Sequence, residues 1–306
     1  MPGQPARKQF LMRTGLYVSG TSPVQMIQAL FHNQDCTIYD LEDSVPQGEK
    51  DAARFLVFNM LKHHRPADKH VQIRVNGLHT PFFAEDMEAA VRARPDAIRV
   101  PKVESADEVH AIRERLDELE AAAGVEKGGI KIWCLIESHI GVLNARAIAE
   151  ADARVEALVL GAEDFTAGMH ATRTKPGWEV FYARNMVLMA CRAAGKGCID
   201  VVFSDIDDPE GLAEDARMAK TLGFDGKTVI HPRQVDTVNA AFTPTQKEIR
   251  HAMRVLDAAR EGERGNKGAV SLDGNMIDVP VMLRARNVIA LAKAAGLKPE
   301  GDYYDM

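Results

Sequence analysis

Residues 157–168, ALVLGAEDFTAG, pass from a purely apolar segment straight into two adjacent carboxylates. Continuous hydrophobicity of this kind is typical of a strand that is covered on both faces, as in a parallel sheet. The stretch therefore predicts a buried strand that delivers acidic side chains to its carboxyl end.

Seven further segments share this aliphatic, β-branched character: GLYVSG at 15–20, CTIYDLED at 36–43, VQIRVN at 71–76, AIRVPKV at 97–103, IKIWCLIES at 130–138, CIDVVFSD at 198–205 and GKTVIHP at 226–232. Segments with helical spacing lie between them, such as 49–64, 106–123 and 211–224. The pattern is a strand–helix unit of about thirty residues that occurs eight times, which predicts an α/β fold, the (β/α)8 TIM barrel. No G-x-G-x-x-G motif follows the first strand, so an open dinucleotide-binding sheet is not favoured.

The chain changes character after the last of these units. A charged helix begins near residue 244, SLDGNMID at 271–278 resembles a hairpin, and a last helix is expected from Pro280 to about Ala295. We therefore expect a catalytic barrel over residues 1–243. Residues 244–306 are expected to form a C-terminal helical extension that packs on the barrel or on a neighbouring subunit.

Composition excludes several classes of protein. Of the 306 residues, 46% are hydrophobic and 27% are charged, and the net charge of −6 is not concentrated in one block. These values favour a globular protein and disfavour a nucleic-acid partner. The chain shows neither a signal peptide nor a long apolar run, and its four cysteines lack C-x-x-C spacing. We expect a cytoplasmic protein with no membrane segment and buried, reduced thiols.

Polar residues follow every predicted strand: Ser19; Asp40, Glu42 and Asp43; Arg74 and Asn76; Lys102; Glu137; Glu163 and Asp164; Asp205; and His231. The carboxyl ends of barrel strands meet at one rim, and barrel enzymes carry their active sites there. The sequence therefore predicts an active site built from this ring.

Glu137 and Asp164 follow adjacent strands and are expected at the same height on the rim. Two carboxylates with open positions suit Mg²⁺, which keeps water or substrate oxygens among its ligands. The alternative is structural, because both side chains could cap helices or pair with Arg74 and Lys102.

Arg74 can form two parallel hydrogen bonds with a substrate carboxylate, a geometry that lysine does not offer. The competing interpretation is a salt bridge to Asp40 or Glu42. The residues alone leave both open.

Several motifs together resemble one family: YVSGTSP at 17–23, YDLEDSV at 39–45, IRVN at 73–76, VPKVE at 100–104, IES at 136–138, GAED at 161–164 and GFDGKTVIHP at 223–232. They are similar to the citrate lyase β subunit family of the HpcH/HpaI aldolase superfamily, over nearly the whole chain. EVFYAR at 179–184, VFSDI at 202–206 and SLDGNMID at 271–278 resemble the citrate lyase branch more than the malyl-CoA lyase branch.

The resemblance implies a magnesium-dependent carbon–carbon lyase that acts on a 3-hydroxyacyl thioester, with Glu137 and Asp164 as the Mg²⁺ ligands and Arg74 bound to the keto-acid product. Expected substrate contacts are Ser19, Lys102 and the backbone N–H groups of Gly161, Ala162 and Glu163. Thr21 and Ser22 are expected near the thioester. Many relatives carry Pro-Gly where this chain has Ser19-Gly20, so the contact to the carrier arm departs from the pattern.

Asp278 matches a carboxylate that, in related lyases, reaches the active site of a neighbouring subunit, which makes it a candidate for proton transfer. The alternative is an N-cap for the helix that begins near Pro280. His231 is a rival base, although a histidine at a strand end before proline is more often structural. The loop at 168–177, with Arg173 and Lys175, is expected either to act as a lid or carrier contact or to be an ordinary solvated loop.

The leading hypothesis is cleavage of citryl-CoA, or of a citryl group on an acyl carrier protein, to oxaloacetate and the acetyl thioester. The same chemistry on citramalyl-CoA or malyl-CoA is the closest alternative. A metal-dependent aldolase for free keto acids and a catalytically silent scaffold or regulatory subunit are the others. The resemblance further implies a homo-trimer or hexamer and a transferase subunit as partner in a citrate lyase complex.

Overall fold

Eight parallel strands close into a barrel in their order along the chain, each paired with the next and the last with the first. They are β1 (Thr14–Ser19), β2 (Cys36–Asp40), β3 (His70–Arg74), β4 (Ala97–Val100), β5 (Lys131–Ile136), β6 (Val155–Leu160), β7 (Gly197–Asp200) and β8 (Gly226–Val229). The (β/α)8 barrel expected from the sequence is confirmed.

The computed structural model describes residues 11–264 and 270–297. Contacts divide these residues into two compact units, with the barrel as one, from Met12 to Phe242, and the C-terminal helices as the other. The first ten residues, which the sequence assigns to the barrel, and residues 265–269 and 298–306 of the extension lie outside the described part.

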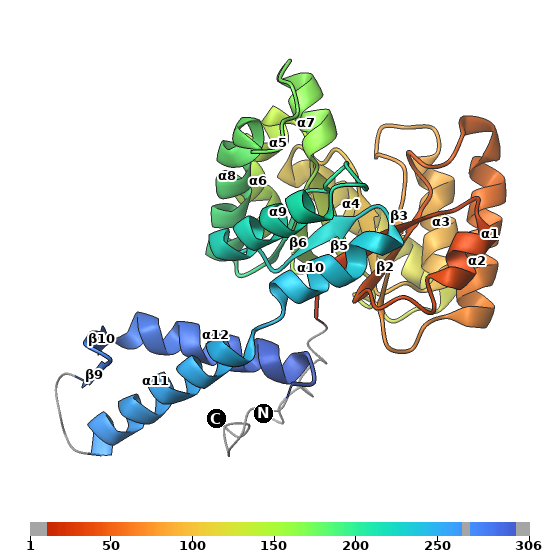
Figure 1. The fold of residues 1–306 in the computed structure, drawn as a ribbon. Helices are drawn as coiled ribbons and strands as arrows, with labels where there is room; N and C mark the ends of the chain where they lie inside the picture. Colours follow the sequence, from red (N-terminus) through yellow and green to blue (C-terminus); the bar gives the residue numbers. More distant parts are fainter. Residues whose placement is uncertain (1–10, 265–269, 298–306) are drawn as a thin grey trace. The chain divides into compact units, whose positions relative to one another are not determined.

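Helices connect the strands and surround the barrel (Figure 1). They are α1 (Pro23–Gln28), α2 (Lys50–His64) after the 3-10 turn η1 (Gln47–Glu49), α3 (Phe83–Ala93), α4 (Ala106–Ala123), α5 (His139–Leu143), α6 (Ala145–Glu150), α7 (Ala162–Gly168), α8 (Trp178–Ala194), α9 (Pro209–Leu222) and α10 (Val235–Phe242) after η2 (Pro232–Gln234). Local chemistry sets their ends. The hydroxyl of Ser105 accepts a hydrogen bond from the Glu108 N–H to cap α4, which ends at Gly124 in the left-handed conformation.

The strands bury both faces, and alternate residues belong to different apolar clusters. The inner cluster contains Ala97, Trp133, Leu135, Ala157, Val159 and Ile199. The intervening residues, such as Ile98, Cys134 and Leu158, belong to the larger cluster that the helices join. Arg99 and Glu137 share the phase of the inner cluster, and Arg74 is the register partner of Arg99. These three side chains therefore project into the barrel.

The four cysteines, Cys36, Cys134, Cys191 and Cys198, are buried free thiols, as expected. Burial is the largest influence on Cys134 and raises its thiol pKa to about 12, so the thiol stays protonated and unreactive. None of the helices in the described part of the chain is both long and apolar enough to cross a membrane.

The second unit consists of α11 (Gln246–Arg264), a hairpin of β9 (Val270–Leu272) and β10 (Asn275–Ile277), and α12 (Val279–Ala294), which packs along α11 (Figure 1). Asp273 and Gly274 form the hairpin turn, both with positive φ, at 52° and 81°. Asp-Gly is the sequence that such a turn favours, which explains why the hairpin was recognisable.

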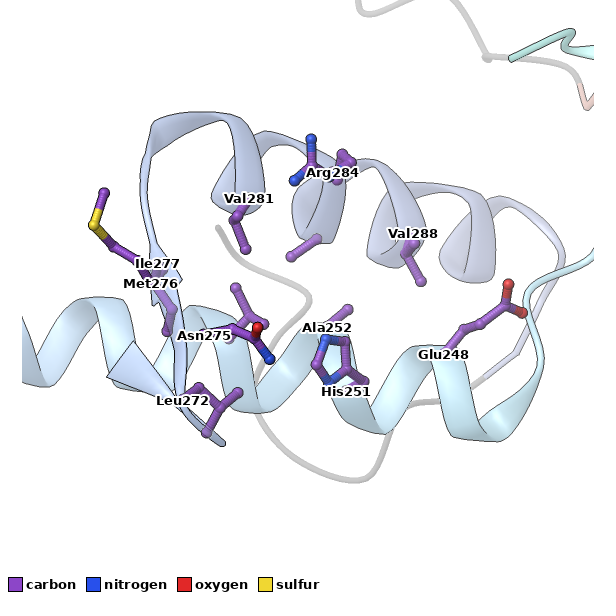
Figure 2. A pocket seen from close by; sticks show the side chains of 12 residues that line it. Glu248, His251, Ala252, Leu272, Asn275, Met276, Ile277, Val281, Arg284 and Val288 are labelled. Atoms are coloured by element: carbon purple, nitrogen blue, oxygen red, sulfur yellow. The ribbon is translucent and has the colours of Figure 1, made fainter. Parts of the chain in front are cut away.

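A pocket of about 500 Å³ opens between α11, the hairpin and α12 (Figure 2). Val255, Val281 and Val288 give it apolar walls, and His251, Asn275 and Arg284 contribute polar groups. None of the site residues expected from the sequence lines this pocket.

Candidate active site

The ring of polar residues follows the barrel strands as the sequence implies. Ser19, Asp40 and Arg74 are the last residues of β1, β2 and β3, and Glu137 comes directly after β5. Lys102 lies two residues beyond β4, and Glu163 and Asp164 lie in the first turn of α7, after β6. Parallel strands therefore bring chemically active side chains from distant parts of the sequence to one rim.

Arg74 is held by carboxylates on several sides. Its Nε and Nη2 donate to Asp40 Oδ1 and Oδ2 at 2.6 and 2.8 Å, and its Nη1 lies 2.9 Å from Glu42 Oε2 and 3.0 Å from Asp43 Oδ2. The salt bridges that the sequence left as an alternative are therefore present. A substrate carboxylate could most easily replace the Asp43 carboxylate at Nη1, because the Asp43 side chain is 68% exposed whereas that of Asp40 is 2% exposed.

The protonation states agree with this arrangement. Burial alone would raise the pKa of Asp40, but the charge and hydrogen bonds of Arg74 hold it below its ordinary value. Burial alone would lower the pKa of Arg74, and Tyr17, Asp40 and Glu42 instead raise it well above its ordinary value. The two-point pair of Asp40 and Arg74 is thus ionised on both sides.

Glu137 lies on the inner face above β5 and is buried. Its Oε1 accepts a hydrogen bond of 2.9 Å from the Lys102 backbone N–H. Gly161 lies close to its other oxygen, because a Cβ added at Gly161 would stand 2.6 Å from Glu137 Oε2. Burial, and next the charge of Asp164, raise the pKa of Glu137 to about 7.

Asp164 pairs with Lys102, with Nζ 3.3 Å from Oδ2. Lys102 has a positive φ of 56°, an uncommon conformation for a residue other than glycine. This conformation lets its backbone N–H bond Glu137 while its ammonium group reaches Asp164. The ion pair is the structural alternative considered from the sequence, and it involves one of the two expected metal ligands.

The donor set fits Mg²⁺. Burial, and next the charge of Asp164, disfavour the ionised form of Glu137, so a cation bound by the two carboxylates would stabilise that form. Both supply hard oxygen ligands. Residues 11–264 and 270–297 contain no group of three or more His, Cys, Asp or Glu side chains that could hold a metal. An ion at this pair therefore takes its other ligands from water or substrate.

The GAED turn offers fewer free donors than expected. The Gly161 N–H donates to the Ile136 carbonyl at 2.9 Å, as part of the link between β5 and β6. The remaining candidates for a substrate carboxylate are the N–H groups of Ala162 and Glu163, in the first turn of α7, where helical N–H groups lack partners within the helix. The Glu163 side chain lies 3.3 Å from Arg173.

The loop after β1 is held by local bonds. Ser19 Oγ lies 3.0 Å from Thr21 Oγ1 and donates to the Ser44 carbonyl at 3.2 Å. Gly20 passes so close to β2 that an added Cβ would stand 2.5 Å from the Asp40 carbonyl. Ser19 is thus fixed next to the loop that carries Glu42 and Asp43.

Both cations of the loop at 168–177 are paired within the chain. Arg173 binds Glu179 at 2.6 Å as well as Glu163, and Lys175 binds Asp208 at 2.6 Å and lies 3.6 Å from Asp205. These pairs favour the interpretation as an ordinary surface loop over that of a basic docking segment.

Asp278 and His231 both cap helices. Asp278 is the N-cap of α12, and its side chain accepts a hydrogen bond of 3.0 Å from the Val281 N–H. His231 caps η2 by accepting from the Arg233 N–H through Nδ1. The capping role considered for Asp278 is present, and it uses Oδ1 alone.

Two groups of residues that support the rim were not identified from the sequence. Lys50 donates to the Leu41 and Glu42 carbonyls and to Asn76, each at 2.8 or 2.9 Å, and so holds the loop after β2 from behind. Arg99 is 1% exposed inside the barrel and contacts Tyr17. A charged residue in the inward phase of AIRVPKV was the available signal for Arg99.

Comparisons with known proteins find relatives of one family along most of the chain. A family model described as HpcH/HpaI aldolase/citrate lyase matches residues 13–232. The citrate lyase subunit beta of Leuconostoc mesenteroides subsp. cremoris is 40% identical over 96% of this chain and 98% of its own length. The mitochondrial citramalyl-CoA lyase of Rattus norvegicus is 31% identical over 92% of this chain and 86% of its own length.

Among solved structures, the protein CitE from Mycobacterium tuberculosis in complex with magnesium, acetoacetate and coenzyme A is similar, with a TM-score of 0.76 and 29% identity. The match covers 92% of this chain and 98% of the other.

Proposed function

This chain belongs to the HpcH/HpaI aldolase/citrate lyase family, and from that premise we propose that it is a Mg²⁺-dependent carbon–carbon lyase that cleaves a 3-hydroxyacyl thioester. The leading substrate is a citryl thioester, cleaved to oxaloacetate and an acetyl thioester. The observation that carries the proposal is the pair Glu137 and Asp164 on the barrel rim. Support also comes from the relatives, which are named as lyases, and from the magnesium and coenzyme A in the similar solved structure.

The reaction requires the tertiary hydroxyl of the citryl group to lose its proton as the C–C bond breaks. The electrons of that bond pass to the α-carbon of the acetyl thioester, which is then protonated. Mg²⁺, when bound, supplies positive charge beside the oxygen that becomes the keto group and orients the neighbouring carboxylate.

The chain's own residues bind and orient the substrate. Glu137 and Asp164 would hold the metal, and Arg74 would bind the keto acid through Nη1 if its carboxylate displaces the exposed Asp43. The N–H groups of Ala162 and Glu163 would donate hydrogen bonds to the distal carboxylate. Ser19 and Lys102 would lie nearest the thioester and the reacting carbons, and Lys102 adds positive charge.

Asp278 is proposed to move protons in the active site of a neighbouring copy, which requires a homo-oligomer, a trimer or hexamer. The acyl group would be carried by a phosphopantetheine arm, either on free CoA or on an acyl carrier protein. A transferase subunit of a citrate lyase complex would be a partner in the second case. The four buried, reduced cysteines support a cytoplasmic location.

Citramalyl-CoA is the second candidate, because a relative of 31% identity is named citramalyl-CoA lyase. Its products would be pyruvate and acetyl-CoA. The two substrates differ in the group that the site must accept on the carbinol carbon, a carboxymethyl or a methyl group.

The deciding experiment offers the purified protein citryl-CoA, citramalyl-CoA and malyl-CoA, each with Mg²⁺ and with EDTA, and measures keto-acid release. We expect Mg²⁺-dependent cleavage, fastest for citryl-CoA. Cleavage of none of the three, or equal rates with EDTA, would refute the proposal.

A further inference from the structure

Arg99 is a buried cation whose side-chain partners are neutral. Its Nε donates to Gln72 Oε1 at 2.9 Å and its Nη1 donates to the Tyr17 hydroxyl at 3.3 Å. In the described part of the chain, no carboxylate lies within ion-pair distance of its guanidinium. Burial of an unpaired charge costs free energy. Because Arg99 is 1% exposed and lacks a counter-ion, we expect it to have a function that offsets this cost.

Aromatic rings take the place of that counter-ion. The Arg99 Cζ lies 5.3 Å from the centroid of the Trp133 ring and 5.5 Å from that of Tyr17. The face of an aromatic ring carries partial negative charge and attracts a guanidinium. The same Tyr17 ring also holds Arg74, whose Cζ is 4.6 Å from its centroid.

We propose that Tyr17 and Arg99 are positioning residues for the keto-acid-binding guanidinium of Arg74, an inference that rests on the proposed function. Asp40 fixes one edge of Arg74 through Nε and Nη2, and the Tyr17 ring fixes the plane of the guanidinium. Arg99 fixes Tyr17 through its hydroxyl and ring. Because Asp40 and Tyr17 together fix the Arg74 guanidinium, its Nη1 points toward the substrate in a single orientation.

Arg99 also compensates an unfavourable charge. Asp40 and Asp43 lie beside Arg74, and their negative charges repel an incoming carboxylate. Because no carboxylate neutralises Arg99, its positive field reaches the inside of the barrel and opposes that repulsion. Because Arg99 itself is buried, salt screens its charge less than it screens a surface charge.

The test measures the binding of oxaloacetate in the presence of Mg²⁺ by calorimetry. Tyr17→Leu is expected to weaken binding about tenfold, the size of one well-packed cation–π contact. Tyr17→Phe keeps the ring and loses only the hydroxyl, so it should restore affinity to within about threefold of the wild type. In turnover of citryl-CoA, KM should rise in Tyr17→Leu with kcat little changed.

Tyr39→Leu is the matched control. Tyr39 is a fully buried tyrosine on β2 whose side chain belongs to the larger cluster that the helices join, on the opposite face of the strands from Arg74. Its replacement should therefore lower stability without changing the inside of the barrel. It should leave oxaloacetate affinity unchanged at a temperature where the variant is folded. Mg²⁺ binding measured with the metal alone should be unchanged in every variant, because within the described residues Tyr17 and Arg99 form no hydrogen bond or ion pair with Glu137 or Asp164.

Arg99→Met provides an independent variant if Tyr17→Leu does not fold. It should weaken oxaloacetate binding at least about threefold, and its effect should be non-additive with that of Tyr17→Leu, as for residues in one contact network. Equal oxaloacetate affinity in wild type and Tyr17→Leu, or in wild type and Arg99→Met, would overturn the inference alone. Wild-type protein that binds Mg²⁺ but no oxaloacetate would instead remove the proposed function, and this inference with it.

Discussion

The guanidinium of Arg74 and the carboxylate of Asp40 form a two-point ion pair between the last residues of β3 and β2, with contacts of 2.6 and 2.8 Å. Asp40 also accepts hydrogen bonds from the backbone N–H groups of Glu42 and Ser44. One buried carboxylate therefore anchors both the arginine of the site and the loop that brings two further acids to it.

Asp40→Asn should lower the free energy of unfolding by about 3 kcal/mol, because it leaves the buried Arg74 without its main counter-charge. Urea denaturation measures this. Asp43→Asn is the control, since the exposed Asp43 side chain forms a pair that is worth about 1 kcal/mol or less. Equal losses in the two variants would show that Asp40 is not the anchor.

Asp164→Asn should abolish Mg²⁺ binding and metal-dependent turnover while the protein stays folded. The Asp164 side chain is 49% exposed, so stability should change by no more than about 1 kcal/mol. Calorimetric titration with Mg²⁺ tests the loss of metal binding, and a thermal melt tests the small change in stability. Normal Mg²⁺ affinity in this variant would remove Asp164 from the ligand set.

The stability of the metal-free protein should depend on Glu137 in a defined direction. Burial and the charge of Asp164 raise its pKa from 4.5 to about 7, so between these values the folded protein holds a proton that the unfolded chain releases. The contribution of Glu137 to stability is therefore fully present below about pH 4.5 and is lost as pH rises through about 7. The difference in unfolding free energy between wild type and Glu137→Gln, measured in EDTA across this window, isolates the effect.

Mg²⁺ affinity should follow the opposite trend. The ion competes with the proton on Glu137, so affinity should rise as pH increases and level off above about pH 7. Calorimetry in buffers of different ionisation enthalpy should detect proton release on Mg²⁺ binding below that pH. Affinity that is constant from about pH 5.5 to about pH 8 would contradict the assignment of Glu137 as a ligand.

Gly161→Ala should weaken Mg²⁺ binding by displacing Glu137. The new Cβ would stand 2.6 Å from Glu137 Oε2 and 2.7 Å from its Cβ, so the carboxylate must move. Gly168→Ala, at the end of the same helix α7, is the control, since its nearest neighbour would be His139 Nδ1 at 3.9 Å. A loss of about tenfold or more in Mg²⁺ affinity for the first variant only is expected, because a misplaced ligand is costly.

The sequence predicted the barrel and the rim for a simple physical reason. In a closed parallel barrel, every strand end lies at the same edge, so Glu137 and Asp164 could be placed together without knowledge of any side-chain conformation. The Asp-Gly hairpin was likewise encoded locally.

The sequence could not predict the partner of each polar group on the rim, because the partners depend on the three-dimensional positions of residues that are far apart in the chain. From the sequence, Arg74 could either bind a substrate carboxylate or form a salt bridge. Only the structure shows that its Nε pairs with Asp40 and its Nη1 lies beside Glu42. The reach of Lys102 to Asp164 depends on a positive φ that no propensity scale assigns to lysine. Use of the Gly161 N–H by the Ile136 carbonyl follows from strand register.

Asp278 offers a test that separates its two roles, because asparagine caps helices as well as aspartate does. Asp278→Ala should lose about 1 kcal/mol of stability with the cap, whereas Asp278→Asn should keep the cap and lose only the carboxylate. If Asp278 transfers protons, both variants lose activity, and the Asn variant is the stable one. Full activity in Asp278→Asn would leave capping as its only role.

If the carboxylate acts in a neighbouring copy, mixing Asp278→Asn with Asp164→Asn under conditions of subunit exchange should restore part of the activity, since some sites then combine one intact metal ligand set with one intact Asp278.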